Sequence, residues 1–430
     1  MRSPWRRLVA FAALVVLIAV VMTTTAGAAK PVTLTIWDWG SPPPSALGAL
    51  DKAYMASHPG VVLKRIHQPF NSYFTLMRAA MAAHTGPDIY ENYASPYVFD
   101  YYQGLLPLTK YVTAAQRKEL IGWNYVSTGL SNSGTPYAIP WSGQGINFYY
   151  NKALFKKAGL NPNSPPTTWA QLLSDCAALK KAGIIPIVAG FKDGYYAEWW
   201  TDVLSMQYVT RSQLAASYAT PNWSSASIAK GFALLATLYT KGYMTPNSQA
   251  IPLFPDTVNN FGDDKGAIFL GLSANNANYS QFRGDKVSPN LGAFVAPLVP
   301  AGKLQSQVFD YGPGLSWTIS SQTKNAAADY AYLTWLASAQ SQDQIFKSSG
   351  TFPNNTLAHP ATTDPLGQTI LGWIHKYPTY LGQVTLIRSN VEAIFDKEAP
   401  LILTGQTSLS SGMQLVEQAQ QMVTPIPPAH

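Results

Sequence analysis

The stretch Val32-Thr33-Leu34-Thr35-Ile36-Trp37-Asp38-Trp39-Gly40 is where we expect the folded part of the chain to begin. The β-branched and aliphatic residues of its first half predict a buried strand. The second half places two tryptophans around a carboxylate at the point where that strand ends. In open α/β sheets the ligand crevice lies outside the carboxyl ends of the strands. If the rest of the chain builds such a sheet, this loop is a candidate ligand contact.

The segments that follow alternate between helix and strand. Apolar residues share one helical face over residues 45–57 and again over 73–84, and a turn containing proline and glycine ends each segment. Short apolar runs that begin at residues 61 and 88 have the composition of strands. A strand–helix–strand–helix–strand order at this spacing predicts βαβ units and a mostly parallel sheet.

The same alternation continues toward the C-terminus. We expect strands over residues 146–150, 266–270, 292–295 and 315–319, and helices over 151–158, 325–338 and 409–422. Residues 134–140 form a turn and a short extended piece, and Thr167 or Thr168 caps a further helix that contains Cys176. Roughly 400 residues remain after the N-terminal segment, which is too many for one core. Because no low-complexity linker divides them, we expect two α/β domains that are joined by several crossings.

Residues 1–29 have the features of a secretory signal. Three arginines precede an apolar run over residues 8–22, and small residues follow that run at 26–28. The run is short for a membrane span, so we expect cleavage near residue 29 or 30, with an uncleaved anchor as the alternative. No cysteine stands directly after the apolar run, so we do not expect a lipid anchor at that point.

The composition indicates a secreted protein that meets uncharged, hydroxyl-rich molecules. Charged residues are 12% of the chain, about half the usual quarter, and aromatic residues are also 12%, with 12 Trp and 24 Tyr. The formal charge of +7 falls to +4 without the three arginines of the signal. No basic cluster appears, which argues against nucleic-acid binding.

Catalytic and metal-binding motifs are missing from the sequence. It contains no nucleophile elbow, no zinc-protease motif, no phosphate-binding Walker loop and no EF-hand loop. The six histidines have no metal-ligand spacing. Cys176 is the only cysteine, so no internal disulfide can form. Because it lies on the apolar face of its predicted helix, we expect its side chain to be buried.

Several stretches resemble motifs of a known family, in the family's order. They are residues 53–61, 84–89, 104–108, 134–140, 148–160 and 166–169. The strongest are Gly134-Thr135-Pro136-Tyr137-Ala138-Ile139-Pro140 and Phe148-Tyr149-Tyr150-Asn151-Lys152-Ala153-Leu154-Phe155-Lys156-Lys157-Ala158-Gly159-Leu160. In these stretches the chain resembles the family 1 extracellular solute-binding proteins, the maltose-binding-protein-like sugar receptors of bacterial ABC importers.

The resemblance implies an α/β, two-lobe periplasmic-binding-protein fold of the type II kind, with about three hinge crossings. The implied N-terminal lobe is 31–140 plus 316–350, and the C-terminal lobe is 141–315 plus 351–430. The protein would be exported to the periplasm or the outer face of the cytoplasmic membrane. As a monomer it would capture a carbohydrate, a di- or oligosaccharide, between its lobes and deliver it to the permease subunits of an ABC transporter. The missing catalytic motifs agree with the resemblance, which implies a receptor that does no bond chemistry, is not an enzyme and uses no cofactor or metal.

Candidate ligand contacts in the first half of the chain follow from the family positions. Trp39 is expected to stack on a sugar ring, and Asp38 either bonds the ligand or caps the next loop. Tyr93 follows the third strand. After the first hinge crossing, relatives place an acidic or amide side chain, which makes Gln144 the first choice and Trp141 the second.

The second half of the chain supplies the remaining candidates. The stretch Phe191-Lys192-Asp193-Gly194-Tyr195-Tyr196-Ala197-Glu198-Trp199-Trp200 is the densest aromatic patch in the sequence. We expect two of the four rings at 195–200 to be core and Tyr195 or Tyr196, together with Trp199, to contact ligand, with Glu198 beside them. Asp310 and Tyr311 precede the next crossing and are further candidates. Residues 271–275 lack the tryptophan that many relatives place there, which argues against a maltodextrin type of binding.

Two other kinds of function stay open at this point. A secreted glycoside hydrolase would need a pair of carboxylates across an aromatic cleft, and Asp38, Asp193, Glu198 and Asp310 are available. A receptor for a non-sugar solute would need several cleft carboxylates for a polyamine, or convergent Arg and Lys for a phosphate ester. The candidate loops are short of both.

Overall fold

The computed structural model describes residues 30–40, 43–210, 213, 226–273, 278–382 and 387–429. The expected signal, residues 1–29, lies outside the described residues, as do Ser41 and residues 274–277. None of the helices in the described ranges is long and apolar enough to span a bilayer.

One eight-stranded sheet runs through the molecule, in the order β2-β1-β3-β7-β4-β5, with β6 on β4 and β8 on β7. Its strands are β1 Val32–Asp38, β2 Val61–His67, β3 Ile89–Tyr93, β4 Ile139–Asn151, β5 Ile268–Leu272, β6 Leu291–Phe294, β7 Phe309–Ile319 and β8 Thr379–Tyr380. The expectation of a mostly parallel sheet is wrong. β1 pairs in parallel with β2 and β3, but β7 and β4 enter antiparallel and make the sheet mixed.

Strands β4 and β7 are much longer than the sequence pattern predicted. The extended piece at 134–140 and the strand at 146–150 belong to one strand that begins at Ile139, and β7 begins at Phe309 rather than near 315. Register shifts between Pro140, Ser142 and Gly143 accommodate the interruption. A side chain at Gly143 would collide with the Tyr311 ring, so glycine here permits the two strands to lie close together. Prolines and glycines that look like breaks in the sequence are thus accommodated inside a paired strand.

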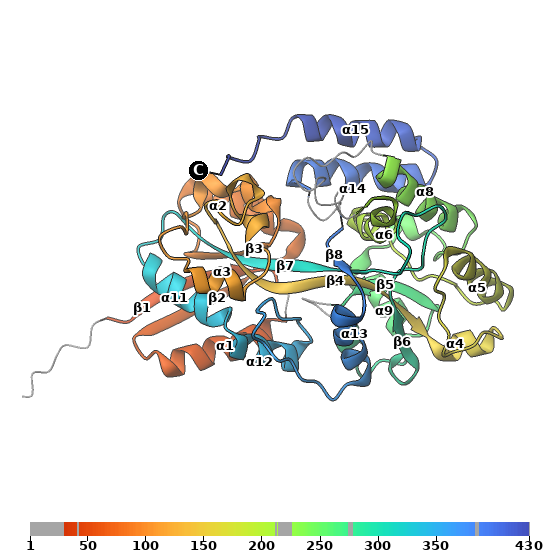
Figure 1. Cartoon of the computed structure of the whole chain (residues 1–430), viewed down its shortest axis with the longest axis horizontal. Helices are drawn as coiled ribbons and strands as arrows, with labels where there is room; N and C mark the ends of the chain where they lie inside the picture. Colours follow the sequence, from red (N-terminus) through yellow and green to blue (C-terminus); the bar gives the residue numbers. More distant parts are fainter. Residues whose placement is uncertain are drawn as a thin grey trace, which may run out of the picture.

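Helices cover the sheet on both sides (Figure 1). They are α1 Pro44–Ser57, α2 Phe70–Ala83, α3 Ala114–Glu119, α4 Lys152–Lys157, α5 Trp169–Lys181, α6 Tyr195–Ser205, α8 Ala226–Thr240, α9 Val258–Gly262, α10 Asn278–Gln281, α11 Ala326–Leu336, α12 Ala339–Ser349, α13 Pro365–Lys376, α14 Ser389–Leu403 and α15 Leu409–Gln421. Thr168 caps α5 in a reciprocal capping box with Gln171, which confirms one of the two expected caps.

The buried side chains form two separate cores, one at each end of the long strands. The first gathers β1, β2, β3, α1, α2 and α11, and the second gathers α5, α6, α8, α13, α14 and α15 with β5 and β6. Trp141 and Leu315 pack in the first core, and Phe346 packs in the second. The fold is therefore α/β with two lobes, and β4, β7 and the segment after α12 pass between them (Figure 1). The lobe limits given above remain a prediction.

The C-terminal tail makes a fourth link between the lobes. It leaves α15 on the second lobe and ends near α2 on the first (Figure 1). There the amide N–H of Gly129 donates to the carbonyl oxygen of Pro427 at 2.7 Å. Arg388 of the second lobe forms an ion pair with Asp100 of the first, and both side chains are nearly buried. These contacts tie the lobes together on the side where α14 begins.

Candidate functional site

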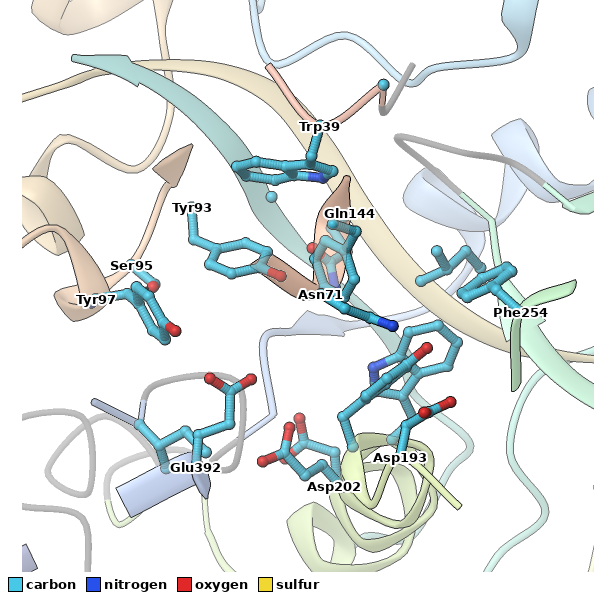
Figure 2. Close-up of a pocket in the computed structure, with 18 of the residues that line it drawn as sticks. Trp39, Asn71, Tyr93, Ser95, Tyr97, Gln144, Asp193, Asp202, Phe254 and Glu392 are labelled. Atoms are coloured by element: carbon cyan, nitrogen blue, oxygen red, sulfur yellow. The ribbon is translucent and has the colours of Figure 1, made fainter. Parts of the chain in front are cut away.

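A pocket of about 500 Å³ lies between the two lobes. Aromatic rings, two amides, hydroxyl groups and four carboxylates line it. In Figure 2, Trp39 lies on one side of the pocket, and Asp193, Asp202 and Glu392 lie on the other. Six of the eleven residues predicted from the sequence line it: Trp39, Tyr93, Gln144, Tyr195, Glu198 and Trp199.

Trp39 is placed in the pocket by the end of β1. Its amide N–H donates to Oε2 of the buried Glu91 at 2.9 Å, which fixes the backbone just past the strand. Its indole packs against Tyr73 and Tyr93, with ring centroids 4.9 Å and 5.3 Å away. Only 8% of the residue is exposed. The ring is thus held rigidly in an aromatic cluster, which suits a stacking surface.

Asp38 does not line the pocket. Its carboxylate accepts from the Arg65 guanidinium at 3.0 Å and from the amide N–H of Gly40 at 2.9 Å, and it lies 3.0 Å from Nδ1 of His67. Strand alternation turns this side chain to the face opposite Trp39, toward β2. Of the two readings of Asp38, its contacts match the capping one, because it braces the backbone that carries Trp39.

The start of α2 adds pocket residues that the sequence did not indicate. The helix begins at Phe70, three residues before the expected start, and Phe70 and Asn71 both line the pocket. Ser95 and Tyr97 follow β3 and line it too. The sequence could have indicated these residues, because ligands bind at the loops and helix starts that follow the carboxyl ends of parallel strands.

Gln144 and Trp141 come from the same strand, β4, but only Gln144 reaches the pocket. The Trp141 indole is buried in the first core, where Nε1–H donates to the Leu336 carbonyl at 3.0 Å and the ring meets Trp317 edge-on. The two positions are three residues apart, and an odd separation along a strand points side chains to opposite faces. Trp141 is therefore a core residue of the first lobe.

One face of α6 forms the opposite wall. Tyr195, Glu198, Trp199 and Asp202 are spaced 3, 1 and 3 residues apart and all line the pocket. Residues with this spacing share one helical face. Tyr196 and Trp200 lie on the other face and are fully buried, and the Tyr196 hydroxyl donates to the Leu270 carbonyl at 2.8 Å. Two of the four rings, Tyr196 and Trp200, are thus core residues. Of the two tyrosines predicted as alternatives, Tyr195 lines the pocket and Tyr196 does not.

Asp310 and Tyr311 lie behind the pocket wall. Both are nearly buried, and the Tyr311 hydroxyl donates to the Pro353 carbonyl at 3.3 Å. Burial raises the pKa of Asp310 well above its usual range, and the nearby carboxylate of Asp202 raises it further.

One aromatic residue of the pocket was not predicted from the sequence. Phe254 lines the pocket beside Trp199, and the two ring centroids are 6.4 Å apart.

The electrostatics of the pocket are one-sided. Asp193, Glu198, Asp202 and Glu392 line it, and no Lys, Arg or His is found among its described lining residues. Burial raises the pKa of Glu198 well above its usual range, with further contributions from Asp396, Glu392 and Asp202. Burial also raises the pKa of Glu392 to about 7, although a hydrogen bond from the Tyr97 hydroxyl opposes that shift.

The described part of the chain contains no group of three His, Cys, Asp or Glu side chains arranged to hold a metal ion. The pocket's aromatic rings, amides and carboxylates are instead the groups that bind a polar organic solute.

The fold is shared with solved structures of low sequence identity. A chitin oligosaccharide binding protein has a TM-score of 0.78 at 21% identity, over 91% of this chain and 99% of that one. The GacH receptor of Streptomyces glaucescens, solved with acarbose, has a TM-score of 0.73 at 18% identity, over 91% and 98%. A maltose-bound MalE3 of T. maritima has a TM-score of 0.71 at 17% identity, over 91% and 100%.

Relatives found by sequence match only part of the chain. The sn-glycerol-3-phosphate-binding periplasmic protein of Yersinia enterocolitica is 52% identical over 53 residues, which is 12% of each chain. A putative binding protein of Brucella abortus is 28% identical over 160 residues, or 36% of this chain and 37% of that one. The chain thus matches well under half the length of these relatives.

The family profile described as "Bacterial extracellular solute-binding protein" matches residues 39–343, which is most of the chain. That match includes the first pocket loop, both long strands and the acidic face of α6. The protein therefore belongs to the bacterial extracellular solute-binding protein family.

Proposed function

We propose that this protein captures a carbohydrate between its two lobes and delivers it to the permease of an ABC importer. The observation that carries the proposal is the pairing of Trp39 on one side of the pocket with Tyr195 and Trp199 on the other. Flat rings pack on the apolar C–H faces of a sugar, while amides, hydroxyls and carboxylates bond its rim. Asn71 and Gln144 supply amides for the rim.

The structural relatives support the same class of solute. The names of three of them refer to a chitin oligosaccharide, to acarbose and to maltose. The pocket volume of about 500 Å³ falls within the usual range for sites that bury a small ligand, which fits a di- or short oligosaccharide.

Capture would proceed by hinge closure around the long strands. A ligand that touches both walls favours the closed form only by the difference between its affinities for the closed and open forms. Residues of both lobes line this pocket, with Trp39 and Phe70 from the first and Trp199 and Glu392 from the second. The closed, loaded protein is the form we propose to dock on the permease, after export from the cell.

A phosphate ester is a weaker candidate, although one relative is named for glycerol phosphate. Recognition of a phosphate uses Arg, Lys or helix N-termini. The pocket instead presents four carboxylates and, among its described residues, no basic side chain. A dianionic ligand would be repelled there.

A glycoside hydrolase is also weaker. Of the four carboxylates considered for that role, Asp38 is bound to Arg65 and Asp310 lies behind the wall. Asp193 and Glu198 both line the pocket, but they come from the same short segment on one wall. A glycosidase places its two carboxyl groups on either side of the scissile bond.

Thermal shift of residues 30–430 against a panel of mono-, di- and oligosaccharides tests the proposal. A solute that binds only the folded state raises the melting temperature as its concentration exceeds Kd. A concentration-dependent rise with one sugar class is expected. A rise with glycerol phosphate but with no sugar would overturn the carbohydrate assignment.

A further inference from the structure

We propose that the bound carbohydrate carries a protonated amine, so that the solute is an amino sugar or a short amino-sugar oligomer. This inference rests on the proposed function and narrows its solute class. It is carried by the arrangement of carboxylates on the α6 and α14 side of the pocket.

Glu198 is the central observation. The residue is 7% exposed, it lines the pocket, and its Oε1 atom has no hydrogen-bond partner among the described residues. A buried carboxyl oxygen without a hydrogen-bond partner is costly, because it has lost its hydration without a replacement. A cationic donor in the pocket would supply the missing partner.

Further carboxylates surround Glu198. Asp202 lies one helical turn along α6, and Glu392 and Asp396 lie one turn apart on α14. Asp193 precedes the helix, and Gly194, at a φ of 80°, brings the start of α6 against the backbone of Asp396, where a side chain would collide. This close packing of two segments concentrates acidic groups on one wall.

Within the described chain, Asp193, Glu198, Glu392 and Asp396 form no ion pair with Lys, Arg or His. Arg78 lines a neighbouring recess that Glu392 and Asp396 also line, but it is directed to Tyr101 and Ser389, at 3.4 Å from each hydroxyl. Asp38 and Asp51, in contrast, are both paired with Arg65.

The neighbouring rings suit an ammonium group as well. Tyr195 and Trp199 stand on the same helical face as Glu198 and line the same pocket. A cation over the face of Trp or Tyr is attracted by the ring quadrupole, and more strongly when desolvated. The α6 face thus offers a carboxylate and aromatic faces to one group.

The amides decide between an amino sugar and a linear polyamine. Asn71 and Gln144 line the pocket, where Asn71 is exposed and Gln144 is half-buried. Each amide carries N–H donors that need an acceptor. Sugar hydroxyl and ring oxygens are acceptors, whereas a fully protonated polyamine has none. An amino sugar therefore fits the Asn71 and Gln144 amides and the carboxylate wall (Figure 2).

Titration calorimetry of residues 30–430 with matched ligands tests this inference. The probes are the glucosamine disaccharide with free amines, its N-acetylated counterpart, the neutral disaccharide cellobiose, and spermidine. We expect the free-amine disaccharide to bind at least about tenfold more tightly than the neutral sugars. Glu198→Gln keeps the shape and removes the charge, and it is expected to abolish the preference for the free-amine disaccharide over its N-acetylated counterpart.

Glu398→Gln is the matched control, because Glu398 is also buried but does not line the pocket. It is expected to leave the preference unchanged. Equal affinity for the free-amine and N-acetylated sugars would overturn the inference and leave the carbohydrate proposal standing. Binding of spermidine with no binding of any sugar would overturn both, as would no binding of any probe. Loss of the preference in Glu398→Gln as well would also count against the role of Glu198.

Discussion

Phe70 and Tyr195 meet edge to face across the cleft, with ring centroids 6.1 Å apart and an interplanar angle of 77°. Phe70 starts α2 on the first lobe, and Tyr195 starts α6 on the second. The Tyr97 hydroxyl bonds Glu392 across the same cleft. Both contacts join pocket residues of the two lobes, so the closure that we propose would also complete the binding site.

Replacing Phe70 with alanine is expected to shift the lobes toward an open arrangement and to weaken ligand binding. The substitution removes an aromatic contact between the lobes, and such contacts contribute about 0.5–1.5 kcal/mol beyond the area they bury. Small-angle scattering of the ligand-free variant should therefore show a larger radius of gyration than the parent. Phe99→Ala is the control, since Phe99 contacts Tyr102 and Tyr137 within the first lobe. An unchanged radius in Phe70→Ala would show that this contact does not bias closure.

Trp199→Ala is expected to weaken sugar binding by about tenfold or more, or at least 1.4 kcal/mol. The indole is half-buried, lines the pocket and packs on Tyr195 at 5.9 Å, so its removal takes away a stacking face. Calorimetric titration measures the loss.

Trp335→Ala is the matched control for that experiment. This indole is also half-buried but packs on Tyr54 at 5.2 Å, away from the pocket. It should lower the melting temperature and leave the dissociation constant unchanged. Equal losses of affinity in the two variants would mean that Trp199 acts only through stability.

The helical pattern of α6 explains why its pocket residues could be predicted. Once Tyr195 faces the cleft, Trp199 must share its face and Trp200 must lie in the core. Two domains joined by several crossings were predictable from the chain length and the missing linker, and the two-lobe fold was implied by the resemblance to the family. The sequence pattern did not decide whether Tyr195 or its neighbour Tyr196 faces the ligand. In the structure the Tyr196 hydroxyl donates to the Leu270 carbonyl in the core.

Other parts of the site depend on contacts that no local pattern encodes. Glu392 and Tyr97 are 295 residues apart in the sequence and meet only through the packing of the two lobes. Asp38 gave no local sign that Arg65 and His67, on the neighbouring strand, would hold it away from the pocket. Phe70 and Asn71 were missed because helix starts are the least certain part of a sequence-based assignment.

Arg65→Met is expected to destabilise the first lobe by about 3–5 kcal/mol, because it leaves two buried carboxylates without their cation. The guanidinium contacts Asp38 at 3.0 Å, Asp51 at 2.7 Å and the Tyr332 hydroxyl at 2.7 Å, and its side chain is 10% exposed. Denaturant unfolding measures the change. Arg283→Met breaks the pair with Asp364, in which the arginine is 46% exposed, and should cost less than about 1 kcal/mol. Similar losses would contradict the structural role of Arg65.

The acidic wall predicts that the ligand-free protein loses stability as the pH rises. Burial raises the pKa of Asp396 to about 9, with Glu392 and Asp193 adding to the shift, and burial raises the pKa of Glu392 to about 7. Raised carboxyl pKa values mean that the folded state holds protons that the unfolded state has already released. Stability is therefore fully present below the unfolded values near 4 and is lost as the pH rises through about 7 and about 9.

Thermal melts between about pH 5 and pH 9 measure this slope. The titratable and charged groups near these two carboxyls are Asp100 and the neutral Tyr97 hydroxyl from the first lobe, Asp193 and Glu198 at the start of α6, and Arg78 across the recess. Asp396→Asn should flatten the alkaline part of the curve of melting temperature against pH.

A saturating free-amine disaccharide should reduce the fall in melting temperature at high pH, because an ammonium group favours the ionised carboxylates. A melting temperature that rises toward pH 9 in the free protein would contradict the carboxyl assignment. A fall that only N-acetylated sugar reduces would show that the wall does not recognise an amine.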